Sequence, residues 1–78
     1  MLPDKSKEIL LDMIEVTNPK LIVGAGIPIF QYLEKTNYSK QEVAQASADL
    51  INNHYVTRGY GSNVIVELLL TQLALDLL

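Results

Sequence analysis

The first hydrophobic pattern of the chain has the period of a helix. Between residues 3 and 16, PDKSKEILLDMIEV, apolar positions recur on one side and charged positions on the other. The apolar side consists of Ile9, Leu10, Met13 and Ile14, and the charged side of Lys5, Glu8, Asp12 and Glu15. Pro3 and Asp4 suit a first helical turn, whereas Asn18 ends the pattern because a residue before proline avoids the α region. We therefore predict a helix over residues 3–16 with a solvated charged face.

An apolar segment with two glycines follows, KLIVGAGIPIF at residues 20–30. It predicts a short extended segment at 20–23, a bend at 24–26, and a helix that Pro28 opens and that runs to about Thr36, since proline fits the first turn of a helix but not its interior. The same letters match part of a nucleotide-binding turn, in which a strand, glycines and a helix N-terminus hold a phosphate. That motif needs a third glycine and an acidic ribose ligand, and neither can be placed here. The bend is the preferred interpretation.

The clearest local signal is a capping box in YSKQEV, residues 38–43. Ser39 is a good N-cap, and Glu42 stands three residues later, where its side chain can reach back to the N-cap backbone. A helix is expected to begin at Lys40, joined to the preceding helix by the short turn TNYS, residues 36–39. Two short helices with such a turn have the length and order of a helix-turn-helix. The helical period gives the second helix an outward stripe that is polar and uncharged: Gln41, Gln45, Ala48 and Asn52.

The segment LINNHYVTRGYGSNVIVELLL, residues 50–70, is compatible with two structures. The β-branched residues on both sides of GYGS favour an antiparallel hairpin over residues 54–68, in which Gly59 and Gly61 supply the turn. Alternatively, a helix capped by Asn63 runs to the end of the chain. Such a helix would be apolar nearly all round and would need an all-α four-helix oligomeric bundle to cover it.

Residues 50–56, LINNHYV, lead directly into Thr57 and Arg58. This sequence resembles the winged-helix family of transcription regulators, including the MarR group. In that family the recognition helix typically ends Leu-x-x-x-Gly-Leu-Val and runs into a hairpin, the wing, with a basic residue on its first strand. His54 stands where the family usually has glycine, at a position that tends to need a left-handed backbone, and His is among the non-glycine residues enriched there. The resemblance implies a mainly α fold with a small β-hairpin, a winged helix-turn-helix over residues 4–68.

A helix-turn-helix of this kind would bind DNA through the outward stripe of its second helix. Glutamine and asparagine side chains can pair with adenine in the major groove, and alanine can contact the thymine methyl group. Lys40 at the helix start and Arg58 on the wing would contact phosphates or the minor groove, with Lys35 as a weaker candidate. An ordinary solvated helix face explains the same stripe equally well.

The charge of the chain limits DNA binding. The formal net charge is −3, from six Lys or Arg and nine Asp or Glu, and no segment is a basic patch. A homodimer would double the few cations at the DNA surface. Within a single domain of residues 1–78, the last ten residues, 69–78, are predicted to form an oligomerisation helix, because they carry more leucines than a small domain can cover. The expected oligomer interface is Leu68, Leu70, Leu73 and Leu77.

The acidity also leaves open another class of function, an acidic protein-interaction adaptor or antagonist that acts through an oligomeric helical surface. Other classes are disfavoured. The chain has one His and no Cys, so we expect no metal site, no cofactor and no enzyme. Its apolar runs are shorter than the roughly 18 residues that span a membrane, and its first residues lack the pattern of a signal peptide. A cytoplasmic protein that does not bind membranes is expected.

Overall fold

The chain forms four helices and three strands, and the computed structural model describes all 78 residues. In chain order the elements are α1 (Asp4–Thr17), β1 (Gly26–Pro28), α2 (Ile29–Lys35), α3 (Lys40–Asn52), β2 (Val56–Gly61), β3 (Val64–Leu70) and α4 (Gln72–Leu75). The predicted first helix and the predicted start of the helix at Lys40 are both confirmed. No helix has the length and apolarity that crossing a membrane requires.

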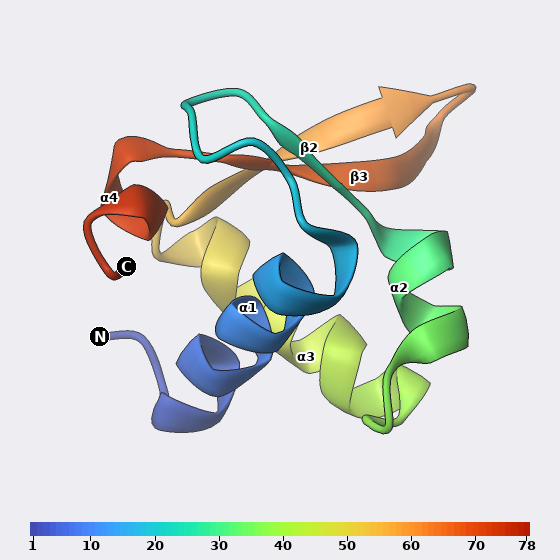
Figure 1. Cartoon of the computed structure of the whole chain (residues 1–78). Coiled ribbons are helices and arrows are strands. Elements are labelled where there is room, and N and C mark those ends of the chain that lie inside the picture. The colour runs from blue at the N-terminus through green and yellow to red at the C-terminus, as the bar shows by residue number, and fades with distance from the viewer.

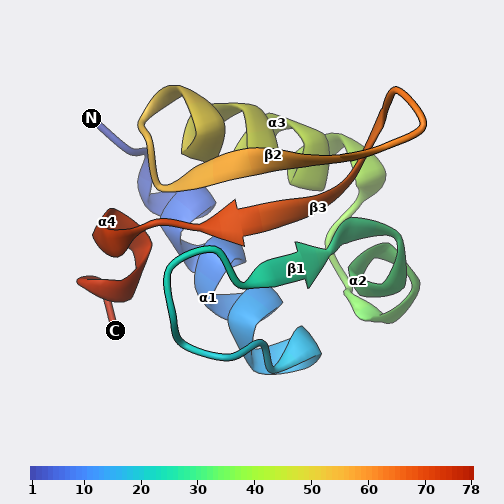
Figure 2. The ribbon, with the colours of Figure 1, turned by 90° about the horizontal axis from the view of Figure 1, so that it is seen from above.

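The strands form one antiparallel sheet in the order β1-β3-β2, so β3 is central and pairs on both sides. The three longer helices lie against one face of this sheet (Figure 1). Seen from above, α3 follows the β2 edge and α2 lies at the end of β1 (Figure 2). The fold is therefore a mixed α/β fold of two layers, and the all-α bundle is wrong because residues 64–70 pair as a strand.

The hairpin between residues 54 and 68 is confirmed, with β2 paired to β3 from Val56 and Leu70 to Gly61 and Val64. Its turn differs from the expectation. The two central residues are Ser62 and Asn63, with φ of 51° and 70°, as a two-residue turn of type I′ requires. Gly59 and Gly61 instead belong to β2 and have no positive φ.

The first strand, β1, does not lie at residues 20–23, where the sequence predicts it. Leu21 and Ile22 form bends and Val23 begins a turn, and the strand starts at Gly26, six residues after the expected start. The turn is completed by Gly24, whose φ of 90° favours glycine. Its amide donates to the Leu70 carbonyl at 2.8 Å, so the partner strand β3 decides where β1 starts. Pro28, which lacks an amide hydrogen, ends β1 at the edge of the sheet and precedes α2.

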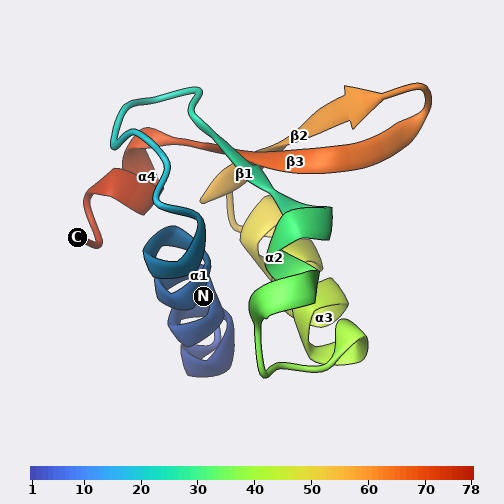
Figure 3. The same cartoon turned by 45° about the vertical axis from the view of Figure 1, so that its right-hand side comes forward.

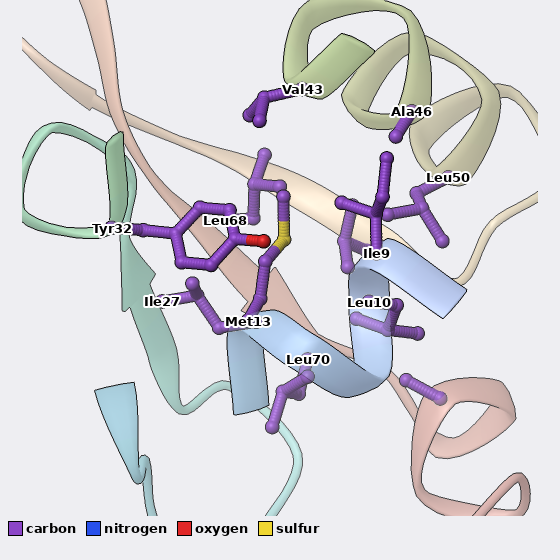
Figure 4. Packing of buried hydrophobic residues seen from close by; sticks show 12 residues of the cluster. Ile9, Leu10, Met13, Ile27, Tyr32, Val43, Ala46, Leu50, Leu68 and Leu70 are labelled. Carbon is purple, nitrogen blue, oxygen red and sulfur yellow. The ribbon is translucent and has the colours of Figure 1, made fainter. Parts of the chain in front are cut away.

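The core lies between the helices and the inner face of the sheet (Figure 4). It contains twelve buried apolar residues: Ile9, Leu10, Met13, Ile27, Tyr32, Val43, Ala46, Leu50, Val56, Leu68, Leu70 and Ala74. All main elements contribute, so each helix depends on the sheet for cover. Burying such side chains contributes about 1.5–3 kcal/mol each for the larger aliphatic residues.

On the outer face of the sheet, two glycines lie next to the side chain of Glu67. The Glu67 side chain lies across the neighbouring strands, over Gly26 on one side and Gly59 on the other. A Cβ on Gly59 would lie 2.5 Å from the Glu67 Cγ atom, and a Cβ on Gly26 would collide with the Glu67 carboxylate. Gly26, which in sequence belonged to the partial nucleotide-binding motif, lies under the flexible end of the Glu67 side chain, whereas Gly59 lies against its Cγ and backbone atoms. The requirement for glycine is therefore stricter at Gly59 than at Gly26.

The C-terminal segment is also different from the expected helix over residues 69–78. Leu69 and Leu70 belong to β3, and α4 is a single turn of four residues. Leu68 and Leu70 are each 1% exposed and face the chain's own core. They are thus removed from the expected oligomer interface, because their alternation along β3 directs them toward the helices.

The end of α3 has the hydrogen bonds of a Schellman motif. The Tyr55 amide donates to the Leu50 carbonyl at 2.9 Å, and the His54 amide donates to the Ile51 carbonyl at 3.1 Å. His54 is the residue in the left-handed region, with φ of 65°. This is the position where the family pattern has glycine, and the expected left-handed backbone is confirmed.

Replacing His54 with glycine is expected to stabilise the fold by roughly 1 kcal/mol, since an L-residue in the left-handed region costs about 1–2 kcal/mol and the greater freedom of unfolded glycine offsets part of the gain. Chemical unfolding would measure the change. His54→Ala is the matched control, because it removes the exposed imidazole but keeps the Cβ atom. Equal stability of the glycine and alanine variants would contradict the prediction.

Candidate functional site

The start of α3 is fixed by the capping box that the sequence predicts. The Glu42 amide donates to Ser39 Oγ at 3.1 Å, and the Ser39 amide donates to Glu42 Oε1 at 2.9 Å. Lys5 of α1 adds an ion pair, with its Nζ atom 3.1 Å from Glu42 Oε2. The hydrogen bond from the Ser39 backbone, followed by that from Lys5, lowers the pKa of Glu42, and the same contact raises the pKa of Lys5. The helix is thereby oriented against α1.

The predicted outward stripe of α3 is exposed along its whole length: Gln41, Gln45, Ala48 and Asn52. The opposite side of α3 carries the buried residues Val43, Ala46 and Leu50. None of these side chains is charged, so the stripe exposes three amide groups and one methyl group.

A depression of about 430 Å³ lies between α1 and the stripe. Its lining includes Ser6 and Asp49, which are joined by a hydrogen bond from Ser6 Oγ to Asp49 Oδ2 at 2.8 Å. The other oxygen, Asp49 Oδ1, accepts from Gln45 Nε2 at 3.2 Å. Ser6 is 2% exposed, so this chain of hydrogen bonds runs from the interior to the outward face.

A second depression, of about 440 Å³, joins the end of α3 to the hairpin. Asn52 and His54 line it from the helix side, and Arg58 and Tyr60 line it from β2. Arg58 and Tyr60 line this depression together with the buried Val56. The structure therefore brings Arg58 and Asn52 to the same depression. Figure 2 shows that β2 runs along α3.

Lys40 lies apart from Arg58. It lines an apolar groove of about 200 Å³ between α2, α3 and the hairpin, with Ile29, Leu33, Ile51 and Ile65. Lys40 thus lies at the N-terminal end of α3 and also lines a hollow with Glu34. Arg58 lies near the C-terminal end of the stripe, in a depression with no acidic residue in its lining.

Of the expected oligomer residues, Leu73 is 47% exposed and Leu77 is half-buried. The structure adds exposed aliphatic residues that the sequence assigned to a strand. Leu21, Ile22 and Val23 are 56%, 57% and 61% exposed in the loop before β1. This loop lies beside α4 in three views (Figures 1, 2 and 3), and its following residues hydrogen bond to Leu70. We refer to Leu21, Ile22, Val23, Leu73 and Leu78 as the apolar end.

The sequence predicted neither the hydrogen bond between Ser6 and Asp49 nor a polar contact at Tyr32. Tyr32 is fully buried, and its hydroxyl donates to Asp12 Oδ2 at 2.6 Å, while Thr36 Oγ1 donates to the tyrosine oxygen at 3.1 Å. Burial, followed by the hydrogen bond to Asp12, raises the pKa of Tyr32. Asp12 was placed on the solvated face of α1, but it is half-buried and ties α1 to α2. The sequence carries no local signal for this pair, which is twenty residues apart.

Comparison with models of protein families, with curated proteins and with solved structures finds no match to this chain.

Replacing Glu42 with glutamine should make the stability of the fold less sensitive to acid. The lowered pKa of Glu42 means that its ionised form stabilises the folded state above the ordinary carboxyl pKa, and that this contribution is lost as the pH falls through the lowered value. The stability difference between wild type and Glu42→Gln should thus shrink between about pH 6 and pH 3. Urea unfolding at several pH values measures it.

The control is Glu15→Gln, which removes an exposed carboxylate of α1 that makes no side-chain hydrogen bond or ion pair. If both variants follow the same pH profile, the capping contact does not carry the effect.

Proposed function

We propose that this protein is a DNA-binding transcription regulator of the winged-helix kind, which places α3 in the major groove. The observation that carries the proposal is that the exposed, uncharged stripe of α3 ends at Asn52, in the same depression as Arg58 and Tyr60 of the hairpin. An α-helix fits the major groove, and a hairpin beside it can reach the adjacent backbone or minor groove.

The order of the elements supports this proposal. A helix, a short strand, two helices and a hairpin follow one another along the chain. The second strand of the hairpin, β3, lies between β1 and β2 in the sheet. The connection between α2 and α3, residues 36–39, has the length of the turn in a helix-turn-helix. The left-handed residue after α3 lies where the family pattern has glycine.

The distribution of charge sets the strength of binding. Arg58 and Lys40 flank the stripe, and Lys35 lies at the end of α2. Neutralising so few phosphates gives weak, salt-dependent affinity, with log K falling by about 0.9 per log unit of salt for each phosphate contact. Two copies of the surface are therefore needed for useful affinity.

The second copy is supplied in our proposal by a homodimer that forms through the apolar end. This surface carries three adjacent aliphatic residues of one loop and leucines of the C-terminus, all about half exposed. The exposed Lys20 and Asp76 are close to these residues in the sequence, and a two-fold arrangement can pair their opposite charges between copies. The apolar end is separate from the outward stripe of α3, so a dimer leaves both stripes free.

Arg58→Ala is expected to weaken binding to all DNA sequences and to reduce the salt slope by about 1 for each copy, because arginine is proposed to contact a phosphate. Fluorescence anisotropy of a labelled duplex, titrated with protein at several salt concentrations, measures both the affinity and the salt slope. Lys7→Ala is the matched control, since Lys7 is an exposed cation that lines neither depression. Equal losses for the two variants would show that only net charge matters, and would remove Arg58 from the interface.

The dimer is tested by changing Ile22 and Leu73 together to glutamate. Wild type should have twice the chain mass of 8.7 kDa at micromolar concentration, and the variant should be a folded monomer because both side chains are about half exposed. The salt slope of DNA binding should fall by about half. Phe30→Glu controls for an added carboxylate at another exposed apolar residue, 55% exposed on α2. A wild-type mass of one chain would overturn the dimer.

The alternative function is that of a protein-interaction adaptor. The apolar groove between α2, α3 and the hairpin, with the exposed Phe30 nearby, favours it over other classes. If wild type is not retained on any duplex at low salt, this alternative replaces DNA binding.

A further inference from the structure

The chemistry of the α3 stripe restricts which base pairs it can read. Bidentate recognition of guanine in the major groove typically uses arginine or lysine, whereas glutamine and asparagine pair with adenine, and alanine contacts the thymine methyl group. The stripe contains two glutamines, one alanine and one asparagine. Lys5 lines the depression beside Gln41 and Gln45, but its ammonium group is paired with Glu42, and the other nearby cations, Lys40 and Arg58, lie toward the two ends of α3. The groups of the stripe therefore match A·T base pairs.

Gln45 differs from the other polar residues of the stripe because its amide is held by the protein. Gln41 and Asn52 make no side-chain hydrogen bond within the chain, whereas Gln45 Nε2 donates to Asp49 Oδ1 at 3.2 Å. Asp49 is itself held, since its second oxygen accepts from the buried Ser6 hydroxyl at 2.8 Å. The bond to Asp49 engages one of the two N–H groups of Gln45 and leaves the other N–H and the carbonyl oxygen free.

The free donor and acceptor of Gln45 are the pair that adenine requires. Adenine presents N7 as an acceptor and N6–H as a donor in the major groove. An amide that is already oriented loses less conformational freedom when it binds. A carboxylate next to the nitrogen also favours the orientation in which that nitrogen, and not the oxygen, faces Asp49.

We infer that this protein reads A·T base pairs through α3, and that Asp49, held by Ser6, is a positioning residue that orients Gln45 for adenine. The inference rests on the proposed DNA-binding function and adds to it the class of base pair and the residue that sets it. It assigns Asp49 a role opposite to that expected from charge alone, because a carboxylate near DNA otherwise only weakens binding.

Two substitutions of Asp49 separate its charge from its hydrogen bonds. Both Asp49→Ala and Asp49→Asn remove one negative charge, so both should raise the general affinity for DNA to a similar extent. Asparagine can still accept from Gln45 Nε2 and can donate its own amide to the Ser6 hydroxyl, which accepts as well as donates. Alanine can do neither. Only Asp49→Ala should therefore lose base discrimination.

The experiment starts from duplexes that wild type selects from a fully randomised pool. Each A·T pair of the selected site is then replaced by G·C, and the ratio of the two affinities is measured for every variant. Wild type and Asp49→Asn should discriminate by roughly 5- to 150-fold at the pair that Gln45 contacts, and Asp49→Ala should approach the low ratio of Gln45→Ala. Thermal unfolding of each variant checks that α3 remains folded.

A double variant decides whether Asp49 acts through Gln45. Once Gln45 is alanine, adding Asp49→Ala should change the discrimination ratio no further, because interacting residues are not additive. Additive losses, equal ratios in all variants, or selected sites rich in G·C at the α3 positions would overturn this inference and leave the proposed function standing. Failure of wild type to retain any duplex would overturn both.

Discussion

The pairing of β3 on both of its sides is the constraint on which the rest of the structure depends. β3 joins β1, which precedes α2, to β2, which follows α3, and it supplies Leu68 and Leu70 to the core. Without it, the helices would expose the apolar sides that they bury against the sheet. The same strand carries Glu67, whose Cγ atom needs the space that a Cβ on Gly59 of β2 would fill.

This constraint also determines the candidate site. β2 must run back along α3 to pair with β3, which brings Arg58 and Tyr60 into one depression with Asn52. The Schellman motif at the end of α3 turns the chain into β2, and His54 adopts the left-handed conformation that this turn requires. The capping box fixes the other end of α3 through residues of its own first turn and through Lys5. The N-terminal end of the outward stripe is thus held by side-chain-to-backbone hydrogen bonds and an ion pair, and its C-terminal end by backbone hydrogen bonds.

The features that the sequence predicted correctly are those with a local cause. The capping box, the outward stripe of α3 and the left-handed residue at position 54 each depend on neighbours within a few residues. The position of β1 and the end of β3 depend on contacts between residues far apart, such as Gly24 with Leu70. Residues 68–70 are all leucine, which is compatible with either a helix or a strand, so only the pairing partner decides. The hydrogen bond between Tyr32 and Asp12 escaped prediction for the same reason.

The low charge of the surface has a consequence for the proposed DNA complex. Binding to any sequence depends mostly on phosphate contacts, and this protein offers few cations near α3 while its net charge is −3. Base contacts must then supply a larger share of the binding free energy than in a strongly basic protein. Such a protein spends less time on non-specific DNA, so the ratio between specific and general affinity can be high even where the affinity itself is modest. The orientation of a single amide such as Gln45 consequently matters more here than it would beside a row of arginines.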